Sequence, residues 1–174
     1  CNKIAPSGML GAKGGRAMAE ETGLRQVVET YGNMVYRLAL AQTHSGHDAD
    51  DVFQEVFLRY LRSAPDFREE EHRRAWLLRV TVNCCKKFHT SFWRRHTTAL
   101  SETIPARTEE EGELLTLLEG LPEKYRAVLH LYYYEGYATG EIAAILGRSP
   151  NTVRSQLSRG RALLHDAWKG AEEL

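Results

Sequence analysis

The segment from Glu141 to Leu164, EIAAILGRSPNTVRSQLSRGRALL, contains two helical patterns separated by a three-residue turn. Apolar residues recur at helical spacing in both patterns, first at Ile142, Ala143 and Leu146 and then at Val153, Leu157 and Leu164. Gly147 suits the left-handed residue that closes a helix, and Ser149-Pro150 supplies a side-chain cap and a first helical residue that needs no amide hydrogen. The sequence therefore predicts two short helices that bury each other's apolar faces across the turn Gly147-Arg148-Ser149.

The second of these helices keeps polar and basic residues on its outward face. These residues are Asn151, Thr152, Arg154, Ser155, Ser158 and Arg159. All can donate hydrogen bonds to phosphates or to base edges in a major groove. The alternative is an ordinary helical hairpin with solvated arginines, but the span from Gly147 to His165 contains four arginines and no acidic residue. The short turn, the caps and this unbalanced positive charge favour a DNA-reading face.

Charge is distributed unevenly along the rest of the chain. The 174 residues carry a formal net charge of zero, which by itself argues against a nucleic-acid partner. However, residues 48–71 are mostly acidic, whereas residues 72–100 contain seven lysines and arginines and no carboxylate. An acidic surface next to a basic one indicates two different partners.

Composition and cysteine spacing exclude several classes of protein. No apolar run is long enough to cross a bilayer, and the first residues lack the apolar core of a secretory signal, so we expect a cytoplasmic location without membrane insertion. The cysteines are Cys1, Cys84 and Cys85, and adjacent cysteines on a helix do not suggest a disulfide framework. A thiol or zinc hydrolase built on Cys84, Cys85 and His89 is the enzymatic alternative, but it lacks further ligands and a glycine-rich phosphate loop. We therefore predict no metal, no cofactor and no catalytic role.

The pattern of apolar residues divides the chain into two small all-α domains. Residues 1–23 are predicted to be a disordered extension, 24–96 the first domain, 97–112 a flexible linker and 113–170 the second domain. The first domain should contain helices from Leu24 to Thr43, from about Asp48 to Arg62 and from about Glu71 to beyond Phe88. The buried stripe of its second helix is predicted to be Val52, Phe53, Val56, Phe57, Tyr60 and Leu61. In the second domain a helix restarts at Pro122, Gly136 closes it, and the two helices described above follow.

One face of the third predicted helix carries an aromatic ring, an amide and several cations. These residues are Trp76, Arg79, Asn83, Lys86 or Lys87, Thr90 and Arg94. Aromatic residues interleaved with cations suit unstacked bases and the phosphates beside them. For Trp76 alone, a place in the core is an equally good interpretation because tryptophans are usually largely buried.

These segments taken together make the chain resemble the extracytoplasmic-function sigma factors, which are two-domain promoter-recognition subunits of bacterial RNA polymerase. DADDVFQEVFLRYLR resembles the polymerase-binding helix of that family, and RRAWLLRVTVNCCKK resembles its downstream-element helix. LPEKYRAVLHLYYYEGYATGEIAAILGRSPNTVRSQLSRGRALL resembles its upstream-element domain. The resemblance covers roughly Val27 to Trp168.

The resemblance implies roles for individual residues. Asp51, Gln54, Glu55 and Leu58 match positions that dock on the clamp helices of the large polymerase subunit. Trp76 and Asn83 match positions at the melted downstream (−10) element, with Arg79, Lys86 and Lys87 on the same strip, and the loop around Phe67 and Arg68 resembles the part that pockets a flipped base. An extruded base needs hydrogen bonds to its edge and a stacking surface. The six outward residues of the last helix match the face toward the upstream (−35) element.

The same resemblance implies a sigma factor that binds core RNA polymerase and promoter DNA, both duplex and single-stranded, and that is held inactive by an anti-sigma factor. Lys87 stands where many members have aspartate, and Gln156 stands where many have arginine, which puts one contact at each position in doubt. The alternative is a two-domain helix-turn-helix regulator that acts on duplex DNA without core polymerase.

Overall fold

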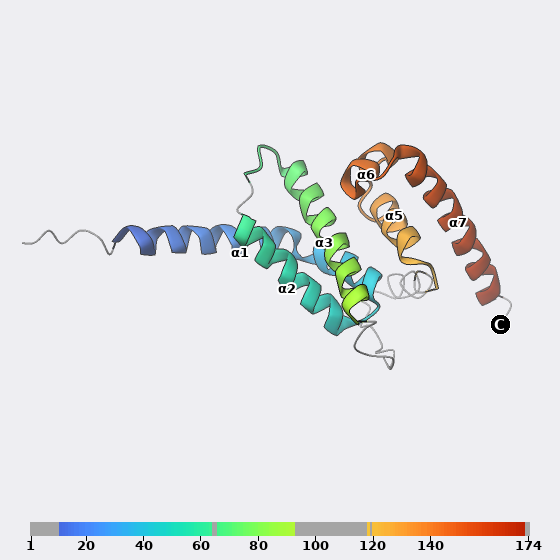
Figure 1. Ribbon diagram of the computed structural model, residues 1–174, viewed down its shortest axis with the longest axis horizontal. Coiled ribbons are helices and arrows are strands. Elements are labelled where there is room, and N and C mark those ends of the chain that lie inside the picture. Colours follow the sequence, from blue (N-terminus) through green and yellow to red (C-terminus); the bar gives the residue numbers. More distant parts are fainter. Residues whose placement is uncertain (1–10, 64–65, 93–117, 119, 173–174) are drawn as a thin grey trace, which may run out of the picture.

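The computed structural model describes residues 11–63, 66–92, 118 and 120–172, and within these ranges it describes side chains from Gly23 to Lys87 and from Leu118 to Lys169. All regular structure in this part of the chain is helical, which confirms the predicted all-α class. The helices are α1 (Gly11–Thr43), α2 (Gly46–Ser63), α3 (Glu70–Phe92), α5 (Glu123–Tyr133), α6 (Thr139–Leu146) and α7 (Pro150–Glu172) (Figure 1). No helix among the described residues is both long enough and apolar enough to cross a membrane.

Helices α1, α2 and α3 form the first unit, which is seen beside α5–α7 in Figure 1. Its second helix begins where the backbone amide of Asp48 donates to the Ser45 hydroxyl over 3.1 Å, a side-chain cap that satisfies one of the free amides of the first turn. The core contains the predicted residues Val52, Val56 and Phe57, all buried. Leu61 was predicted to join them, but 44% of its surface is exposed. That prediction was wrong because Leu61 lies in the last turn of α2, where it borders a hollow between α1, α2 and the start of α3 rather than a packed face.

The start of α1 differs from the sequence-based expectation. Residues 11–23 were assigned to a disordered extension, whereas the helix begins at Gly11. Ala12, Ala17 and Ala19 have high intrinsic helix propensity, which the glycines of this segment only partly offset. Residues 1–10 lie outside the described part of the chain.

Helices α5, α6 and α7 form the second unit, and its local signals agree with the prediction. Gly136 adopts a φ of 73° and the amide of Tyr137 donates to the Leu131 carbonyl over 3.0 Å, which closes α5 as a glycine cap does. Gly147 adopts a φ of 62° after α6. The amide of Thr152 then donates to the Ser149 hydroxyl over 3.1 Å, so α7 begins at Pro150 with the predicted cap.

The two units meet in a shared apolar cluster, and a second cluster is formed by the first unit alone. Leu38 of α1 and Leu78 and Val82 of α3 are fully or almost fully buried in the cluster that contains Leu131 and Ile142 of the second unit. Two arginines cross the junction in opposite directions. Arg126 of α5 donates to the carbonyls of Leu121 (2.7 Å) and Gln42 (2.9 Å), the latter in the last turn of α1, where a cation is favoured.

From the first unit, Arg74 of α3 donates to both the carbonyl (3.0 Å) and the carboxylate (2.8 Å) of Glu135. The pattern of apolar residues predicted two small helical domains, and the structure shows the two units packed against each other. The predicted linker at residues 97–112 lies outside the described residues.

Candidate nucleic-acid and protein interfaces

The outward face of α7 carries all six residues that the sequence placed there. Each of them is exposed: Asn151, Thr152, Arg154, Ser155, Ser158 and Arg159. Beneath them Val153 and Leu157 are buried, so the helix is held by its apolar side and leaves its donors free of the core. Within this face, Arg154 donates to the side chain of Asn151. The result is a solvent-facing row of hydrogen-bond donors on a rigid helix.

Beside this row, a hollow of about 360 Å³ lies between the start of α5 and the first turns of α7. Its lining includes four of the predicted residues together with Lys124, Tyr125 and Gln156. The ammonium group of Lys124 lies 4.9 Å from the centre of the Tyr125 ring. The sequence did not predict a site role for Lys124, because its place beside the α7 row depends on how α5 packs against α7.

The predicted strip on α3 is only partly exposed. Arg79, Asn83 and Lys87 are exposed and Lys86 is half-buried. Trp76 is half-buried, with its ring centre 5.9 Å from that of Tyr60 and 6.0 Å from that of Phe67. Trp76 is therefore both part of the packing and part of the strip. The side chains of Thr90 and Arg94, which extend the predicted strip, lie outside the described residues.

The loop before α3 brings Phe67 and Arg68 to the same end of the strip. Phe67 is half-buried against Tyr60 and Trp76, its ring centre lies 5.8 Å from the guanidinium of Arg73, and Arg68 is exposed. This aromatic cluster, formed by Tyr60, Phe67 and Trp76, offers ring surfaces on which a planar base can stack. Tyr60 was predicted as a core residue, and its place beside the strip follows only from the packing of α2 against α3.

Next to the aromatic cluster lies a hollow of about 720 Å³ bounded by α1, α2 and the first turn of α3. The hydroxyl of Tyr31 donates to the carboxylate of Glu70, which also accepts from Arg73. Burial and the neighbouring carboxylate raise the pKa of Tyr31 to about 12, so its hydroxyl remains a donor at neutral pH. One side of this hollow is therefore a hydrogen-bond network formed by Tyr31, Glu70 and Arg73.

Another cation of α3, Arg74, makes contacts within the protein, with residues of the second unit. Besides its two bonds to Glu135, its guanidinium lies 4.9 Å from the centre of the Tyr137 ring. Burial alone would raise the pKa of Glu135, but His130, whose Nε2 lies 3.5 Å from the carboxylate, and the hydrogen bond from Arg74 bring it below its ordinary value. Arg79 approaches the second unit as well, since a Cβ placed on Gly147 would lie 3.1 Å from Arg79 Nη2.

The predicted polymerase-binding residues lie on one side of α2. Gln54 and Leu58 are exposed, with 42% of the Leu58 surface accessible, and Asp51 and Glu55 are half-buried. Glu55 pairs with Arg59 over 2.7 Å. Leu58 is exposed on the same side of α2 as the carboxylates of Asp51 and Glu55, and such a surface suits a basic protein partner better than DNA.

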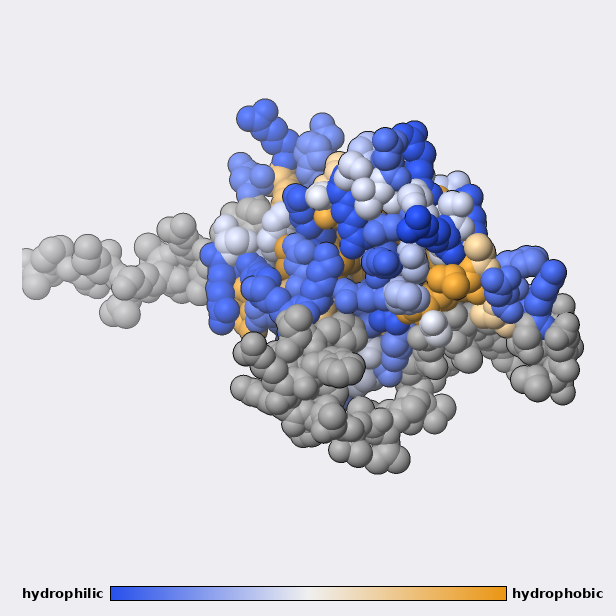
Figure 2. Space-filling model, turned by 45° about the vertical axis from the view of Figure 1, so that its right-hand side comes forward, coloured by the Kyte–Doolittle hydropathy of each residue, from blue (hydrophilic) through white to orange (hydrophobic). Residues whose placement is uncertain are grey.

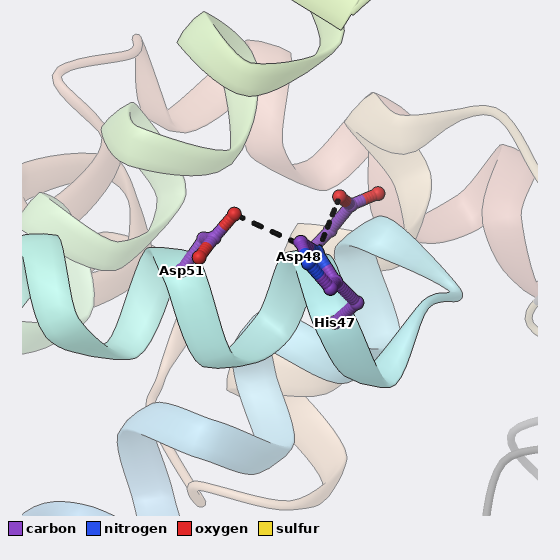
Figure 3. A group of neighbouring side chains, drawn as sticks. All are labelled: His47, Asp48 and Asp51. Atoms are coloured by element: carbon purple, nitrogen blue, oxygen red, sulfur yellow. Dashed lines mark ion pairs between the residues drawn. The ribbon is translucent and has the colours of Figure 1, made fainter.

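Three potential metal ligands lie at the start of this helix, and Figure 3 shows how they are arranged. His47 Nδ1 lies 3.8 Å from Asp48 Oδ1 and 3.6 Å from Asp51 Oδ2. These ligand atoms lie within 4.8 Å of one another and belong to exposed or half-buried residues. Asp48 also lies in the first turn of α2, where a carboxylate complements the helix dipole without any ion.

Cys84 and Cys85 are buried, and burial raises the pKa of both thiols. A thiol with a raised pKa is a poor nucleophile and a poor metal ligand, because both roles require the thiolate. The side chain of His89, the third member of the enzymatic alternative, lies outside the described residues. The buried thiols are therefore accounted for as small apolar residues.

The second unit also exposes apolar surface away from the α7 row. A hollow of about 500 Å³ lies between α5 and α7, bordered by Leu129, His130, Tyr133, Arg161 and Leu164 among others. Most of the surface seen in Figure 2 is hydrophilic, but an apolar patch interrupts it. On α7 itself, Leu163 and Trp168 are 41% and 50% exposed.

Comparison with known proteins gives matches to both units. Residues 27–96 match the family model of sigma-70 region 2, and residues 111–164 match that of sigma-70, region 4. The ECF RNA polymerase sigma factor SigE of Mycolicibacterium smegmatis is 32% identical over an alignment of 154 positions that covers 81% of this chain. The chain spans 60% of the length of that relative.

Two solved structures are similar in fold. The sigma factor RpoE of Bartonella quintana, solved in complex with the anti-sigma factor NepR, superimposes with a TM-score of 0.68 and 17% identity, covering 83% of this chain and 96% of that one. CnrH, solved in complex with the cytosolic domain of CnrY, gives a TM-score of 0.64 and 26% identity, covering 88% and 94%. The fold is therefore shared beyond what sequence identity alone reveals.

Proposed function

Because this chain belongs to the extracytoplasmic-function group of the sigma-70 family, we propose that it binds core RNA polymerase and directs initiation at promoters that contain −35 and −10 elements. It also aids the melting of the downstream element. It acts in the cytoplasm, where the polymerase is, and contributes binding energy rather than a chemical step. The enzyme partner supplies all of the catalysis.

The observation that carries the proposal is the presence of three chemically different surfaces on one chain. The side of α2 around Leu58 is acidic, the strip of α3 combines aromatic rings with cations, and the outward face of α7 presents hydrogen-bond donors. A regulator that acts on duplex DNA alone needs only the last of these. A factor that joins a polymerase to an opening promoter needs all three.

On α7, the exposed donors support recognition of the paired upstream element in the major groove. Arg154 and Arg159 reach base edges or phosphates, and Asn151 and Thr152 lie near the helix N-terminus, where phosphates are favoured. The pairing of Arg154 with Asn151 holds the guanidinium in a defined position before DNA binds.

On α3, the exposed amide of Asn83 and the aromatic cluster support capture of an unpaired base of the downstream element. The cluster supplies a stacking surface and Asn83 supplies both a donor and an acceptor for the base edge. Arg79, Lys86 and Lys87 lie on the same helix and suit the adjoining phosphates. Lys87 is exposed, so at the position where many members have aspartate this chain favours a phosphate contact.

On α2, Asp51, Gln54, Glu55 and Leu58 support docking on a basic groove of the large polymerase subunit. The acidic groups attract and orient the basic partner at long range. Leu58 offers apolar area that is exposed to solvent in the free protein and would be buried in the complex. Neutralising these carboxylates should therefore lower the association rate constant more than it shortens the lifetime of the complex.

The docked arrangement of the two units has to open for this function. The two elements lie about 25 base pairs apart, which is about 85 Å of B-DNA at about 3.4 Å per pair. Here the strip residue Arg79 approaches Gly147 in the turn that precedes α7, and α7 itself has 23 residues, a length of about 35 Å. The docked body cannot reach both elements at once. Family membership also supports an anti-sigma partner, which would act by holding such a body closed.

Run-off transcription with core polymerase and a promoter library tests the proposed function. Wild type should initiate only at promoters that carry both elements, Asn83→Ala should reduce open-complex formation, and Arg154→Ala should reduce upstream discrimination. Glu29→Gln, at an exposed residue of α1 that belongs to none of the three surfaces, is the control. Failure of the wild-type chain to co-elute with core polymerase in moderate salt, with no inhibitor bound, would overturn the proposal.

A further inference from the structure

Arg148 lies in the turn between α6 and α7 and connects three parts of the second unit. Its backbone amide donates to the Ala143 carbonyl over 2.9 Å, which fixes the turn. Its half-buried guanidinium donates to Gln156 Oε1 over 2.7 Å and reaches the Lys124 carbonyl at 3.4 Å. The side chain of Arg148 therefore lies between the second turn of α7 and the first turn of α5.

This contact determines how the amide of Gln156 is oriented. A guanidinium has only donors, so it can pair only with the oxygen of the amide. Because the Gln156 oxygen accepts from Arg148, the NH₂ group of Gln156 points away from Arg148 and is available to another acceptor. Gln156 no longer offers adenine an unoccupied donor-acceptor pair, because its amide oxygen is already used by Arg148.

Gln156 lines the hollow of about 360 Å³ beside the DNA-facing row. The other polar groups around it are donors or can donate: Lys124, Asn151, Thr152, Ser155 and Arg159. Burial lowers the pKa of Arg148 from its ordinary value, although the charge of Glu123 opposes this change. A guanidinium that has lost part of its water is stabilised by an anion placed nearby.

We propose that Arg148 and Gln156 together form a phosphate-binding position for the upstream duplex, in which Arg148 supplies the charge and orients the amide, and Gln156 donates to a phosphate oxygen. Arg148 is thus a positioning residue as well as a source of charge. An arginine at position 156 would put two guanidinium groups in contact, whereas glutamine pairs with Arg148. This inference rests on the proposed binding of duplex DNA and assigns a contact within it.

Fluorescence anisotropy of the full chain with labelled duplexes, measured over a salt series, tests the position. Gln156→Glu keeps an acceptor for Arg148, so the variant should melt at or above the wild-type temperature, but it replaces the donor with an anion. Its affinity should fall about 10-fold or more on promoter and non-promoter duplexes alike, because phosphate contacts are independent of sequence. Gln26→Glu, exposed on α1, carries the same charge change and should bind like wild type.

Arg148→Ala should reduce the slope of log affinity against log salt by about 0.9, the value for one phosphate contact. If Gln156→Glu binds as tightly as Gln26→Glu, the proposed position is wrong. A loss confined to one base pair of the promoter would also overturn it and would assign Gln156 to a base edge. If the wild-type protein binds no duplex, the proposed function itself is wrong. The wild-type measurement alone reveals this outcome, so it is distinguished from a failure of the Arg148–Gln156 position.

Discussion

The two DNA-facing surfaces, on α7 and on α3, differ in how far the protein uses them for its own packing. The six donors of α7 are exposed and contact only near neighbours on their own helix or its cap. On α3, Trp76 belongs to the aromatic cluster, Arg74 is bound by Glu135, and Arg79 approaches the turn at Gly147. The α7 surface is ready to bind, whereas the α3 surface has to exchange internal contacts for contacts with DNA.

The largest expected effect is a loss of stability when a side chain of α3 is removed from the cluster shared by the two units. Leu78 is fully buried in the shared core, so Leu78→Ala should lower the free energy of unfolding by about 2–5 kcal/mol. Urea denaturation measures this loss. Leu163→Ala, on exposed α7 surface, is the matched control and should change stability by less than about 0.5 kcal/mol. A loss below about 1 kcal/mol for Leu78→Ala would mean that the units do not dock in solution.

Trp76 tests whether the α3 surface has two roles. Trp76→Ala should destabilise the protein by about 2–3 kcal/mol, because it removes a half-buried ring from contact with Tyr60 and Phe67, and it should also weaken binding to single-stranded downstream DNA. Thermal unfolding and anisotropy with a single-stranded probe measure the two effects. Trp76→Phe should recover most of the stability. If Trp76→Ala changed stability alone, Trp76 would be a core residue and not part of the strip.

On the α7 surface, by contrast, substituting Arg154 should change DNA recognition without changing stability. Arg154→Ala should reduce discrimination between upstream sequences by about 1–3 kcal/mol if the guanidinium contacts a base edge, while leaving stability within about 0.5 kcal/mol of wild type because the residue is exposed. Competition binding with single-base variants of the duplex gives the discrimination. Equal weakening on every sequence would assign Arg154 to a phosphate instead.

The smallest effect should be the dependence of docking on pH. The pKa of Glu135 is lowered in the folded protein, so its contribution to stability is present above its unfolded pKa and is lost as pH falls through the folded pKa. Because 32% of the Arg74 side chain is exposed, the contribution should be only about 1 kcal/mol. Unfolding of wild type and Glu135→Gln between pH 7 and pH 3 measures it. Parallel stability curves for the two proteins would show that the pair contributes nothing.

Local signals in the sequence were sufficient for most of the helix boundaries and for the α7 surface. The caps at Ser149 and Gly147 were predicted correctly because each depends on residues within one helical turn. The exposure of Arg154 and its neighbours followed from the spacing of Val153 and Leu157, since a helix that buries one face must present the other. Leu61 was assigned wrongly because periodicity says which side of a helix is apolar, and not how far along the helix a partner covers it.

The sequence by itself determined that this chain is helical, that it has an acidic α2, a basic and aromatic α3 and a helix-turn-helix, because these properties depend on residues close together in the chain. Only the tertiary structure decided that Arg74 meets Glu135 and that Arg126 reaches Gln42, contacts that span 61 and 84 residues. It also decided the pairing of Arg148 with Gln156 across the turn. Such contacts depend on how the helices pack. The sequence offers each arginine several possible acceptors, and the packing determines which of them lies within hydrogen-bond distance.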